Sequence, residues 1–295
     1  MSCSERGHRL VTLLAVALAG GGVVSAGEPE RLTQDGRLKK DPVFVEGGEA
    51  IVFAVTESPE RVSLMRLRLA DRLVERLHPQ APTSEFEAAF SPDGRWCAFV
   101  QQREVTNVKL VIQDLRGNKE AIFDPGSDRA HLGCPSIAPD ASRIIFSLPA
   151  PGGQQIVSVN MQGQDRRLLT NNSGIHNWPT FSPDGKRIAF SSSRDGDFEI
   201  YVMNADGSDV RRLTASRGRD IRPSWSPDGK RIAFTSARDG DEEVYVVNAD
   251  GSGLVRVTQH PEQDDYPIWH PDGRRLVTVS ERDGQFDLYL VEVRR

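Results

Sequence analysis

The sequence predicts an all-β protein: a six-bladed β-propeller with four-stranded antiparallel blades, closed by its N-terminal strand. Three observations lead to this prediction. A short motif recurs at a fixed spacing, each repeat reads as four short strands, and the two ends of the chain complement each other. Repeats of about 40–50 residues are typical of solenoids and propellers. With 295 residues, the chain is long enough to bury a large core as one domain.

The recurring motif is the tetrad Ser-Pro-Asp-Gly, which is intact or recognisable in five copies. The last three steps between copies are each 44 residues long. A worn sixth copy precedes them, where segment 41–53 aligns with segment 222–234 and Glu-Gly-Gly at 46–48 replaces the tetrad. Six copies indicate six blades. The prolines of the five clear copies are Pro92, Pro139, Pro183, Pro227 and Pro271.

One repeat, residues 222–258, shows how four strands arise. Strand-like runs at 222–225, 230–237, 243–248 and 254–258 are separated by turns rich in Asp and Gly. In the tetrad, Pro fixes φ at the second position of the turn, Asp is compatible with the backbone conformation of the third, and Gly adopts the left-handed conformation that follows. Three tight turns joining four strands form a meander, which is one propeller blade. Gly or Pro recurs about every ten residues, so helices are not expected.

The ends of the chain predict how the ring closes. The last copy stops after its third strand, at 288–293, and has no equivalent of the strand at 254–258. The sequence Arg-Leu-Thr at 31–33 matches the same triplet at 212–214. We therefore expect residues around 29–33 to form the outer strand of the last blade, which leaves no open sheet edge.

The N-terminus has the features of a signal peptide. Arg6 and Arg9 precede an apolar run at 10–19, and small residues follow at 24–26. We expect residues 1–26 to be removed after Ala26 and residues 27–295 to form the propeller. The apolar run is too short for a good membrane span, so we expect a periplasmic or secreted protein without membrane insertion. The net charge of −5 offers no basic surface for nucleic acid.

Three cysteines occur in the chain, and Cys3 would leave with the signal peptide. Cys97 aligns with Ile188 and is expected to act as a small hydrophobic residue inside a strand. Cys134 aligns with Trp178, at the start of a different strand. Whether Cys97 and Cys134 form a disulfide is left open, because they fall at different positions of neighbouring repeats.

The fourth copy reads Trp-Pro-Thr-Phe-Ser-Pro-Asp-Gly-Lys-Arg-Ile-Ala-Phe at 178–190, then Ser-Arg-Asp-Gly at 193–196 and Asn-Ala-Asp-Gly at 204–207. This string resembles the repeat of the TolB-type propellers, which are relatives of the WD-repeat class, and the resemblance covers residues from about 31 to 295. It implies a six-bladed propeller in the periplasm, in an envelope system where the propeller holds the peptidoglycan-associated lipoprotein. TolB proteins also carry an α/β domain before the propeller, which we expect this chain to lack.

The loops divide between the two faces of the predicted disc. The tetrads and the Asn-Ala-Asp-Gly turns share one face and vary little, so we interpret them as structural. The opposite face carries the Arg-Asp-Gly turns and the first residues of the innermost strands, which vary from blade to blade. Variable loops on a rigid scaffold often serve in recognition, and Trp, Tyr and Arg dominate interface hot spots. The alternative that these residues only plug the channel stays open. The partner-binding residues predicted at the channel mouth are Trp178, Arg222, Tyr266, His176, Asp220 and Asp264.

The chain has no Gly-x-Ser-x-Gly elbow for a serine nucleophile. We therefore predict a non-enzymatic, monomeric scaffold of the cell envelope that binds a protein or peptide, with an envelope lipoprotein as candidate partner and no cofactor. Calcium is a secondary idea, at the loop of Asp195, Asp197 and Glu199 or at the acidic group of Asp220, Asp264 and Asp265. The alternative function is a metal-assisted, lyase-like carbohydrate-active enzyme that uses the same face, with His131, His176 and His260 as metal ligands.

Overall fold

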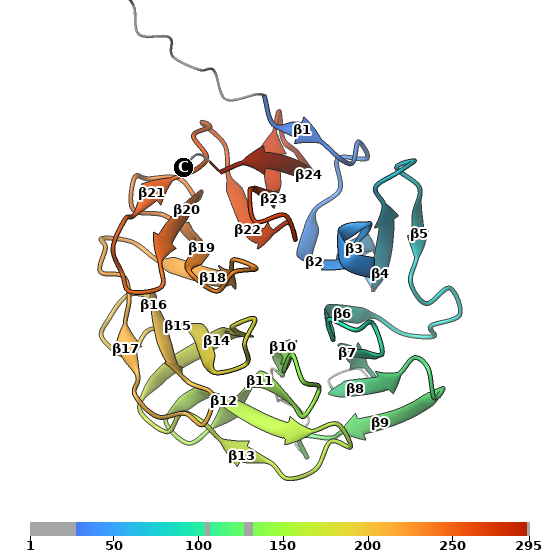
Figure 1. Ribbon diagram of the computed structural model, residues 1–295. Helices are drawn as coiled ribbons and strands as arrows, with labels where there is room; N and C mark the ends of the chain where they lie inside the picture. The colour runs from blue at the N-terminus through green and yellow to red at the C-terminus, as the bar shows by residue number, and fades with distance from the viewer. Residues whose placement is uncertain (1–27, 104–106, 127–131, 294–295) are drawn as a thin grey trace, which may run out of the picture.

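The computed structural model describes residues 28–103, 107–126 and 132–293. These residues form 24 β-strands and one three-residue 3-10 helix, η1 (Glu46–Gly48), which stands where the first copy lacks the tetrad. The strands surround a central axis and build a disc (Figure 1). Within this part of the chain, no helix is long and apolar enough to cross a membrane. The predicted signal peptide, residues 1–26, lies outside the described residues.

The strands pair as antiparallel meanders of four. Four of the sheets have four strands each, and a fifth sheet has eight. The eight-stranded sheet consists of two four-stranded meanders, joined only where β12 and β14 pair in parallel over two residues. The described residues thus contain six four-stranded meanders, one for each copy in the sequence. The prediction of an all-β propeller with four-stranded antiparallel blades is confirmed.

Each strand takes one of four places along the radius of the disc. The innermost strands are β2 (Lys39–Val45), β6 (Glu85–Phe90), β10 (Gly133–Ile137), β14 (Gly174–Phe181), β18 (Asp220–Trp225) and β22 (Asp264–Trp269). The second strands are β3 (Ala50–Ser58), β7 (Trp96–Gln102), β11 (Arg143–Ala150), β15 (Arg187–Ser192), β19 (Arg231–Ser236) and β23 (Arg275–Arg282). The third strands are β4 (Arg61–Arg68), β8 (Val108–Asp114), β12 (Gly153–Asn160), β16 (Glu199–Asn204), β20 (Glu243–Asn248) and β24 (Gln285–Glu292). The outer strands are β5 (Val74–Arg76), β9 (Lys119–Phe123), β13 (Arg167–Leu168), β17 (Arg211–Arg212), β21 (Val255–Arg256) and β1 (Glu30–Arg31).

The N-terminal strand β1 closes the ring, as the ends of the sequence predict. It pairs antiparallel with β24, and Glu30 lies opposite Leu290. The Thr33 hydroxyl donates to Asp287 Oδ1 at 2.6 Å, just as the Thr214 hydroxyl donates to Glu199 Oε2 at 2.7 Å. The same contact between a threonine and an acidic residue therefore holds the outer strand in both blades, and residues 31–33 replace the strand that the last copy lacks.

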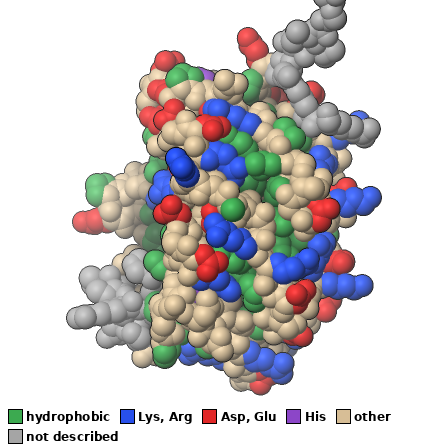
Figure 2. Space-filling model, turned by 90° about the vertical axis from the view of Figure 1, so that its left-hand side faces the viewer, with side chains coloured by type: hydrophobic (Ala, Val, Ile, Leu, Met, Phe, Trp, Pro, Cys, Tyr) green, Lys and Arg blue, Asp and Glu red, His purple; other side chains and the backbone are tan. Residues whose placement is uncertain are grey.

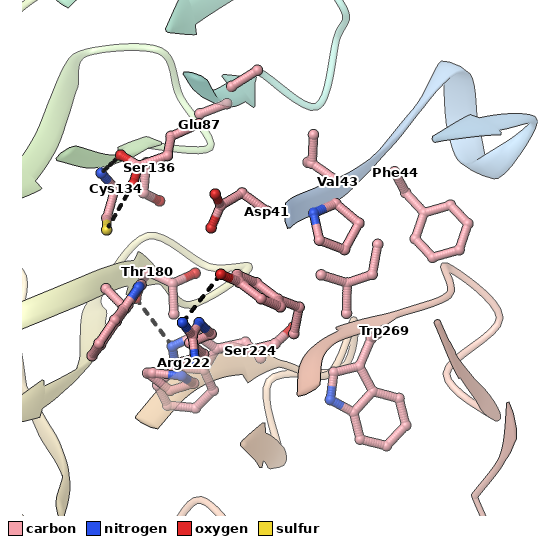
Figure 3. A pocket seen from close by; sticks show the side chains of 18 of the residues that line it. Asp41, Val43, Phe44, Glu87, Cys134, Ser136, Thr180, Arg222, Ser224 and Trp269 are labelled. Carbon is pink, nitrogen blue, oxygen red and sulfur yellow. Dashed lines mark hydrogen bonds between the residues drawn. The ribbon is translucent and has the colours of Figure 1, made fainter. Parts of the chain in front are cut away.

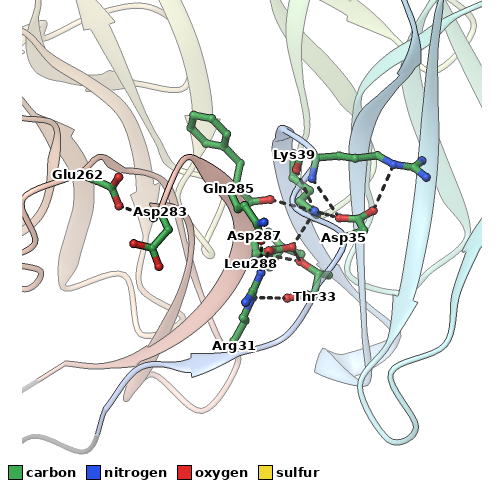
Figure 4. A network of polar contacts seen from close by, with 11 residues as sticks. Arg31, Thr33, Asp35, Lys39, Glu262, Asp283, Gln285, Asp287 and Leu288 are labelled. Atoms are coloured by element: carbon green, nitrogen blue, oxygen red, sulfur yellow. Dashed lines mark hydrogen bonds and ion pairs between the residues drawn. The ribbon is translucent and has the colours of Figure 1, made fainter.

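The carboxylate of Asp287 anchors this closure (Figure 4). Besides Thr33, it accepts hydrogen bonds from Arg31 and from Lys39 Nζ, the latter at 2.9 Å. Lys39 is fully buried, and its ammonium also donates to the Phe286 carbonyl oxygen at 3.0 Å. Burial raises the pKa of Asp287, but the hydrogen bonds from Thr33, Lys39 and Arg31 outweigh burial, so that this pKa lies below its ordinary value.

The hydrophobic core lies between neighbouring blades. Phe190 of β15, for example, packs with Ile145 and Ile156 of the preceding blade. Cys97 is buried in β7, where the alignment places it. Burying a phenylalanine ring such as that of Phe190 stabilises the folded protein by about 1.5–3 kcal/mol. Equivalent positions of five second strands carry a buried phenylalanine: Phe53, Phe99, Phe146, Phe190 and Phe234.

The tetrads have the structural role that their constancy predicts. The Ser182 hydroxyl donates to Asp184 Oδ1 at 2.6 Å, and Gly185 has a φ of 70°. Arg187, which follows this tetrad, donates from Nη2 to the Gly229 carbonyl oxygen of the next tetrad at 2.9 Å. One turn therefore braces the next around the disc. On the rim near β17 and β21, positive and negative side chains are interspersed (Figure 2).

Removal of the closing strand tests the closure. Deleting residues 27–36 from the mature protein takes away β1 and two partners of Asp287, Arg31 and Thr33. We expect the melting temperature to fall by roughly 10 °C or more, because 1 kcal/mol shifts it by about 2–4 °C in a chain of ~200 residues. Thermal unfolding followed by circular dichroism measures the shift. An unchanged melting temperature would show that β1 does not hold the ring closed.

A single substitution at Asp287 tests the anchor. Asp287→Ala removes the buried counter-ion of the Lys39 ammonium, which then keeps only the exposed Asp35, and should cost about 3 kcal/mol in free energy of unfolding. The control is Asp71→Ala, which breaks an exposed ion pair with Arg68 and should cost about 0–1 kcal/mol. Urea unfolding measures both. Equal losses for the two variants would contradict the assigned role of Asp287.

Candidate functional site

Each innermost strand contains a bulge that turns one side chain toward the axis. The pairing of every innermost strand with its second strand shifts register there. One non-glycine residue at each bulge has a φ between 46° and 56°, in the left-handed region, which costs an L-residue roughly 1–2 kcal/mol. Because all six blades share this conformation, it belongs to the repeat. The six residues, called the channel ring below, are Asp41, Glu87, Cys134, Trp178, Arg222 and Tyr266.

The channel ring lines a cavity of about 470 Å³ on the axis (Figure 3). Residues from all six innermost strands contribute to its wall. The bulges lie near the starts of these strands. In the fifth blade, the start of the strand at Asp220 is opposite Ser236, next to an Arg-Asp-Gly turn. The ring therefore lies toward the variable face of the disc, and six blades present six different side chains to one cavity.

Arg222 is held firmly on one side of the cavity. Its guanidinium carbon lies 4.8 Å from the ring centroid of Trp178 and 4.0 Å from that of Tyr266. Its Nη1 is 2.9 Å from a carboxylate oxygen of Asp265, and its Nη2 donates to the Tyr266 hydroxyl at 3.1 Å. Burial, and next the charge of Asp41, raise the pKa of the Tyr266 hydroxyl. These contacts fix the guanidinium between the two aromatic rings.

Glu87 and Cys134 are joined on the opposite side. The Cys134 backbone N–H donates to Glu87 Oε2 at 2.5 Å, and the thiol donates to Asn177 Oδ1 at 3.3 Å. Burial raises the pKa of Glu87. Burial, followed by the charge of Glu87, raises the pKa of the Cys134 thiol, which therefore stays protonated and unreactive. The structure has Cys97 and Cys134 as free cysteines.

Asp41 differs from its neighbours in the channel ring. Within the described part of the chain, its carboxyl group makes no hydrogen bond or ion pair with another residue, and it points into the cavity (Figure 3). Burial raises its pKa to about 8, and the charge of Glu87 adds to this shift. At neutral pH the Asp41 carboxyl is therefore largely protonated.

The six residues predicted from sequence divide into two groups. Trp178, Arg222 and Tyr266 belong to the channel ring, where the structure brings them together. For the other three residues, the structure corrects the predicted position. His176, Asp220 and Asp264 are buried inside their blades and do not line the mouth of the channel. Each forms a hydrogen bond with a serine of the adjacent second strand instead. The pairs are His176 with Ser192, Asp220 with Ser236 and Asp264 with Ser280.

Asp41, Glu87 and Cys134 were not predicted as site residues, although the sequence holds a signal for them. Asp41 and Cys134 stand directly before the first proline of their copies, as Trp178 does, while Glu87 precedes Ala88 at the equivalent place. Applying the alignment of Cys134 with Trp178 to all six copies would have found the complete ring.

The residues considered for metal binding are engaged elsewhere. His176 is buried, His260 Nδ1 accepts a hydrogen bond from the Glu262 N–H at 3.1 Å, and His131 lies outside the described residues. In the calcium candidate loop, Asp195 accepts a hydrogen bond from Tyr201, and Glu199 pairs with Arg212 at 2.6 Å. Over the ranges that the structure describes, no group of three or more His, Cys, Asp or Glu side chains is placed to hold a metal ion.

Comparisons with known proteins agree with this architecture. The family model described as TolB beta propeller domain matches residues 160–295. A structure assigned to TolB of Agrobacterium tumefaciens is similar, with 27% identity, a TM-score of 0.67 and coverage of 80% of this chain and 86% of that chain. Curated proteins give no match. Residues 160–295 therefore belong to the TolB-type β-propeller family.

Two further solved structures share the fold. TolB from Acinetobacter baumannii has 22% identity and a TM-score of 0.65, and the match covers 83% of this chain but only 64% of that one. An oligogalacturonate lyase in complex with manganese has 16% identity and a TM-score of 0.61, with coverage of 90% of this chain and 93% of that chain. The present chain thus spans less than two thirds of the Acinetobacter protein.

The buried position of His176 leads to a stability prediction. In the fifth blade, Arg238 donates to the equivalent Asp220 at 2.8 Å, whereas Nη2 of Arg194 in the fourth blade is buried without a partner in the described residues. His176→Asp would supply the missing carboxylate and should stabilise the protein by about 1 kcal/mol. The reverse change, Asp220→His, should destabilise it. Urea unfolding of both variants at pH 7 tests this pairing.

The same substitution should change the response to acid. Burial, followed by the charge of Arg194, lowers the pKa of His176 to about 4. The unfolded chain binds this proton already near pH 6.5. Stability therefore falls as the pH drops from about 6.5 toward 4, and His176→Asp removes this contribution. If the free energy of unfolding depends on pH in the same way for the wild type and for His176→Asp in this window, His176 is not buried in its neutral form.

Proposed function

We propose that this chain, whose residues 160–295 are TolB-type propeller repeats, is an exported, non-enzymatic scaffold of the cell envelope. It binds a protein or peptide partner through the channel ring and the variable face around it. The partner inserts a side chain or a chain end into the cavity, while the surrounding loops contact its surface. An envelope lipoprotein is the candidate partner.

The contrast between the channel ring and the rest of the repeat carries this proposal. The tetrads keep nearly the same chemistry in each copy because they brace the blades. The ring shares one strained backbone conformation but carries acidic, thiol, basic and aromatic side chains. Backbone strain and mixed side chains around one cavity are typical of a recognition site on a rigid scaffold.

Export is supported by the N-terminal sequence, where basic residues, an apolar run and the small residues at 24–26 follow one another in the order of a signal peptide. The similarity to TolB of Agrobacterium tumefaciens supports the envelope assignment. The protein is proposed to act as a monomer, with residues 27–295 as one propeller.

A capture experiment tests this function. The mature protein is immobilised and exposed to envelope extract, and the wild type is compared with the double variant Arg222→Ala plus Tyr266→Ala. The double variant removes the cation–π pair from the cavity and should lose the proteins that the wild type retains. The matched control is Asp206→Ala plus Asp250→Ala, two exposed turn residues on the opposite face.

Circular dichroism confirms that each variant is folded before capture is compared. If the double variant retains the same proteins while the control variant loses them, the binding face is the one with the Asn-Ala-Asp-Gly turns. Elemental analysis of protein purified without chelator addresses the alternative of a metal-assisted lyase. A tightly bound transition metal at one equivalent would contradict the proposal of a non-enzymatic scaffold.

A further inference from the structure

The cavity holds a carboxyl group that the described residues leave unpaired, that of Asp41. Asp41 lies at the bulge of β2, and its carboxyl group points into the cavity (Figure 3). Polar groups inside a protein normally find partners, so this carboxyl group points to a ligand that carries a donor.

The charges around Asp41 favour a cationic donor. Arg222 of β18 faces Asp41 across the cavity but is already paired with Asp265 and stacked between two aromatic rings. On the other side, Glu87 of β6 adds a second carboxyl group. The charges of Arg222 and Lys40 lower the pKa of Asp41, but burial and the charges of Glu87 and Asp265 outweigh them. Cys134 of β10 is a protonated thiol, and Tyr266 of β22 is a protonated phenol.

The chemical type of the cation follows from which groups of the cavity Arg222 already occupies. A guanidinium group prefers a flat aromatic surface and a carboxylate fork, and Arg222 takes both aromatic faces and Asp265. A primary ammonium group is a compact charge with three N–H donors, which fits between two carboxyl groups. The apolar walls at Pro42 and Ala88 suit the methylene groups of such a side chain.

We propose that the channel binds a primary ammonium group carried by a peptide, held between Asp41 and Glu87. This inference rests on the proposed function and names the chemistry that the partner presents. The ammonium belongs either to a lysine side chain or to the α-amino end of the peptide. Both sources share the same contacts in the cavity, and they differ in how binding depends on pH.

Binding is coupled to proton release. Asp41 is largely protonated at pH 7, because burial, together with Glu87, raises its pKa to about 8. The ammonium group binds the ionised form, so affinity increases as the pH rises through this value. For a lysine side chain, whose own pKa is about 10.4, affinity at pH 9 should exceed that at pH 6 by roughly 100-fold. For an α-amino group, with a pKa near 8, affinity should pass through a maximum near pH 8.

Titration calorimetry with the mature protein tests the inference with three defined probes. N-acetyl-lysine amide carries only the side-chain amine, alanyl-alanine amide carries only the α-amine, and N-acetyl-norleucine amide is a neutral analogue of the first. We expect saturable binding of one of the two amines and none of the neutral analogue. The pH profile of the probe that binds then identifies the source of the ammonium group.

The variant that removes the charge is Asp41→Asn. Asparagine tolerates the left-handed backbone conformation of this position, which has a φ of 49°. It should weaken binding of the amine at pH 9 at least tenfold and abolish the rise of affinity with pH. The matched control, Asp206→Asn on the opposite face, should bind as the wild type does.

The inference is overturned if neither amine binds saturably, if the neutral analogue binds equally well, or if Asp41→Asn leaves affinity and pH profile unchanged. The capture experiment separates this failure from failure of the proposed function. If the wild type still captures a partner that the Arg222 and Tyr266 double variant loses, the scaffold function stands and only the ammonium chemistry is wrong. If capture fails as well, the proposed function fails with it.

Discussion

The buried contact of Asp287 with Arg31, Thr33 and Lys39 is the constraint on which the rest of the disc depends. A propeller has no central layer, so its blades keep their places only if the first and the last are joined. Here one carboxylate binds the N-terminal strand and the first innermost strand together. Because Asp41 follows Lys39 by two residues, the closure of the ring also positions the carboxyl group that faces the cavity. The contacts of Asp287 therefore hold both the closed ring and the site in place.

The bulge in each innermost strand explains why one position of the repeat varies freely. Around it, side chains must fit the adjacent blade, as the buried phenylalanines show. At the bulge, the side chain leaves the sheet and faces the axis, where its neighbours belong to other blades and the cavity. A left-handed backbone conformation costs roughly 1–2 kcal/mol at each non-glycine residue. The stable packing of the blades offsets that cost, and the position is left free to change its chemistry.

The sequence was sufficient for the strands and the closing strand, but only for half of the predicted site. The strands follow from turn residues at fixed spacing, which act locally, and the closure follows from the phase of the copies. His176 and Trp178 are two residues apart, so a regular strand would place them on the same face. The register shift between Asn177 and Thr180 breaks this alternation, and His176 points into the blade while Trp178 points into the cavity. A bulge depends on the pairing of strands, and periodicity does not reveal it.

Variation among repeats is thus not by itself a sign of function. The position two residues before each ring residue also varies, from Lys39 through His176 to Asp264, yet these side chains are buried. The charged side chains there have partners within the protein: Lys39 has Asp287, and Asp264 accepts hydrogen bonds from Ser280 and Arg282 through Oδ1. Asp41 has no such partner among the described residues, although it varies in the same way. In this propeller, a variable polar side chain that faces the cavity without a partner is therefore a stronger sign of recognition than variation alone.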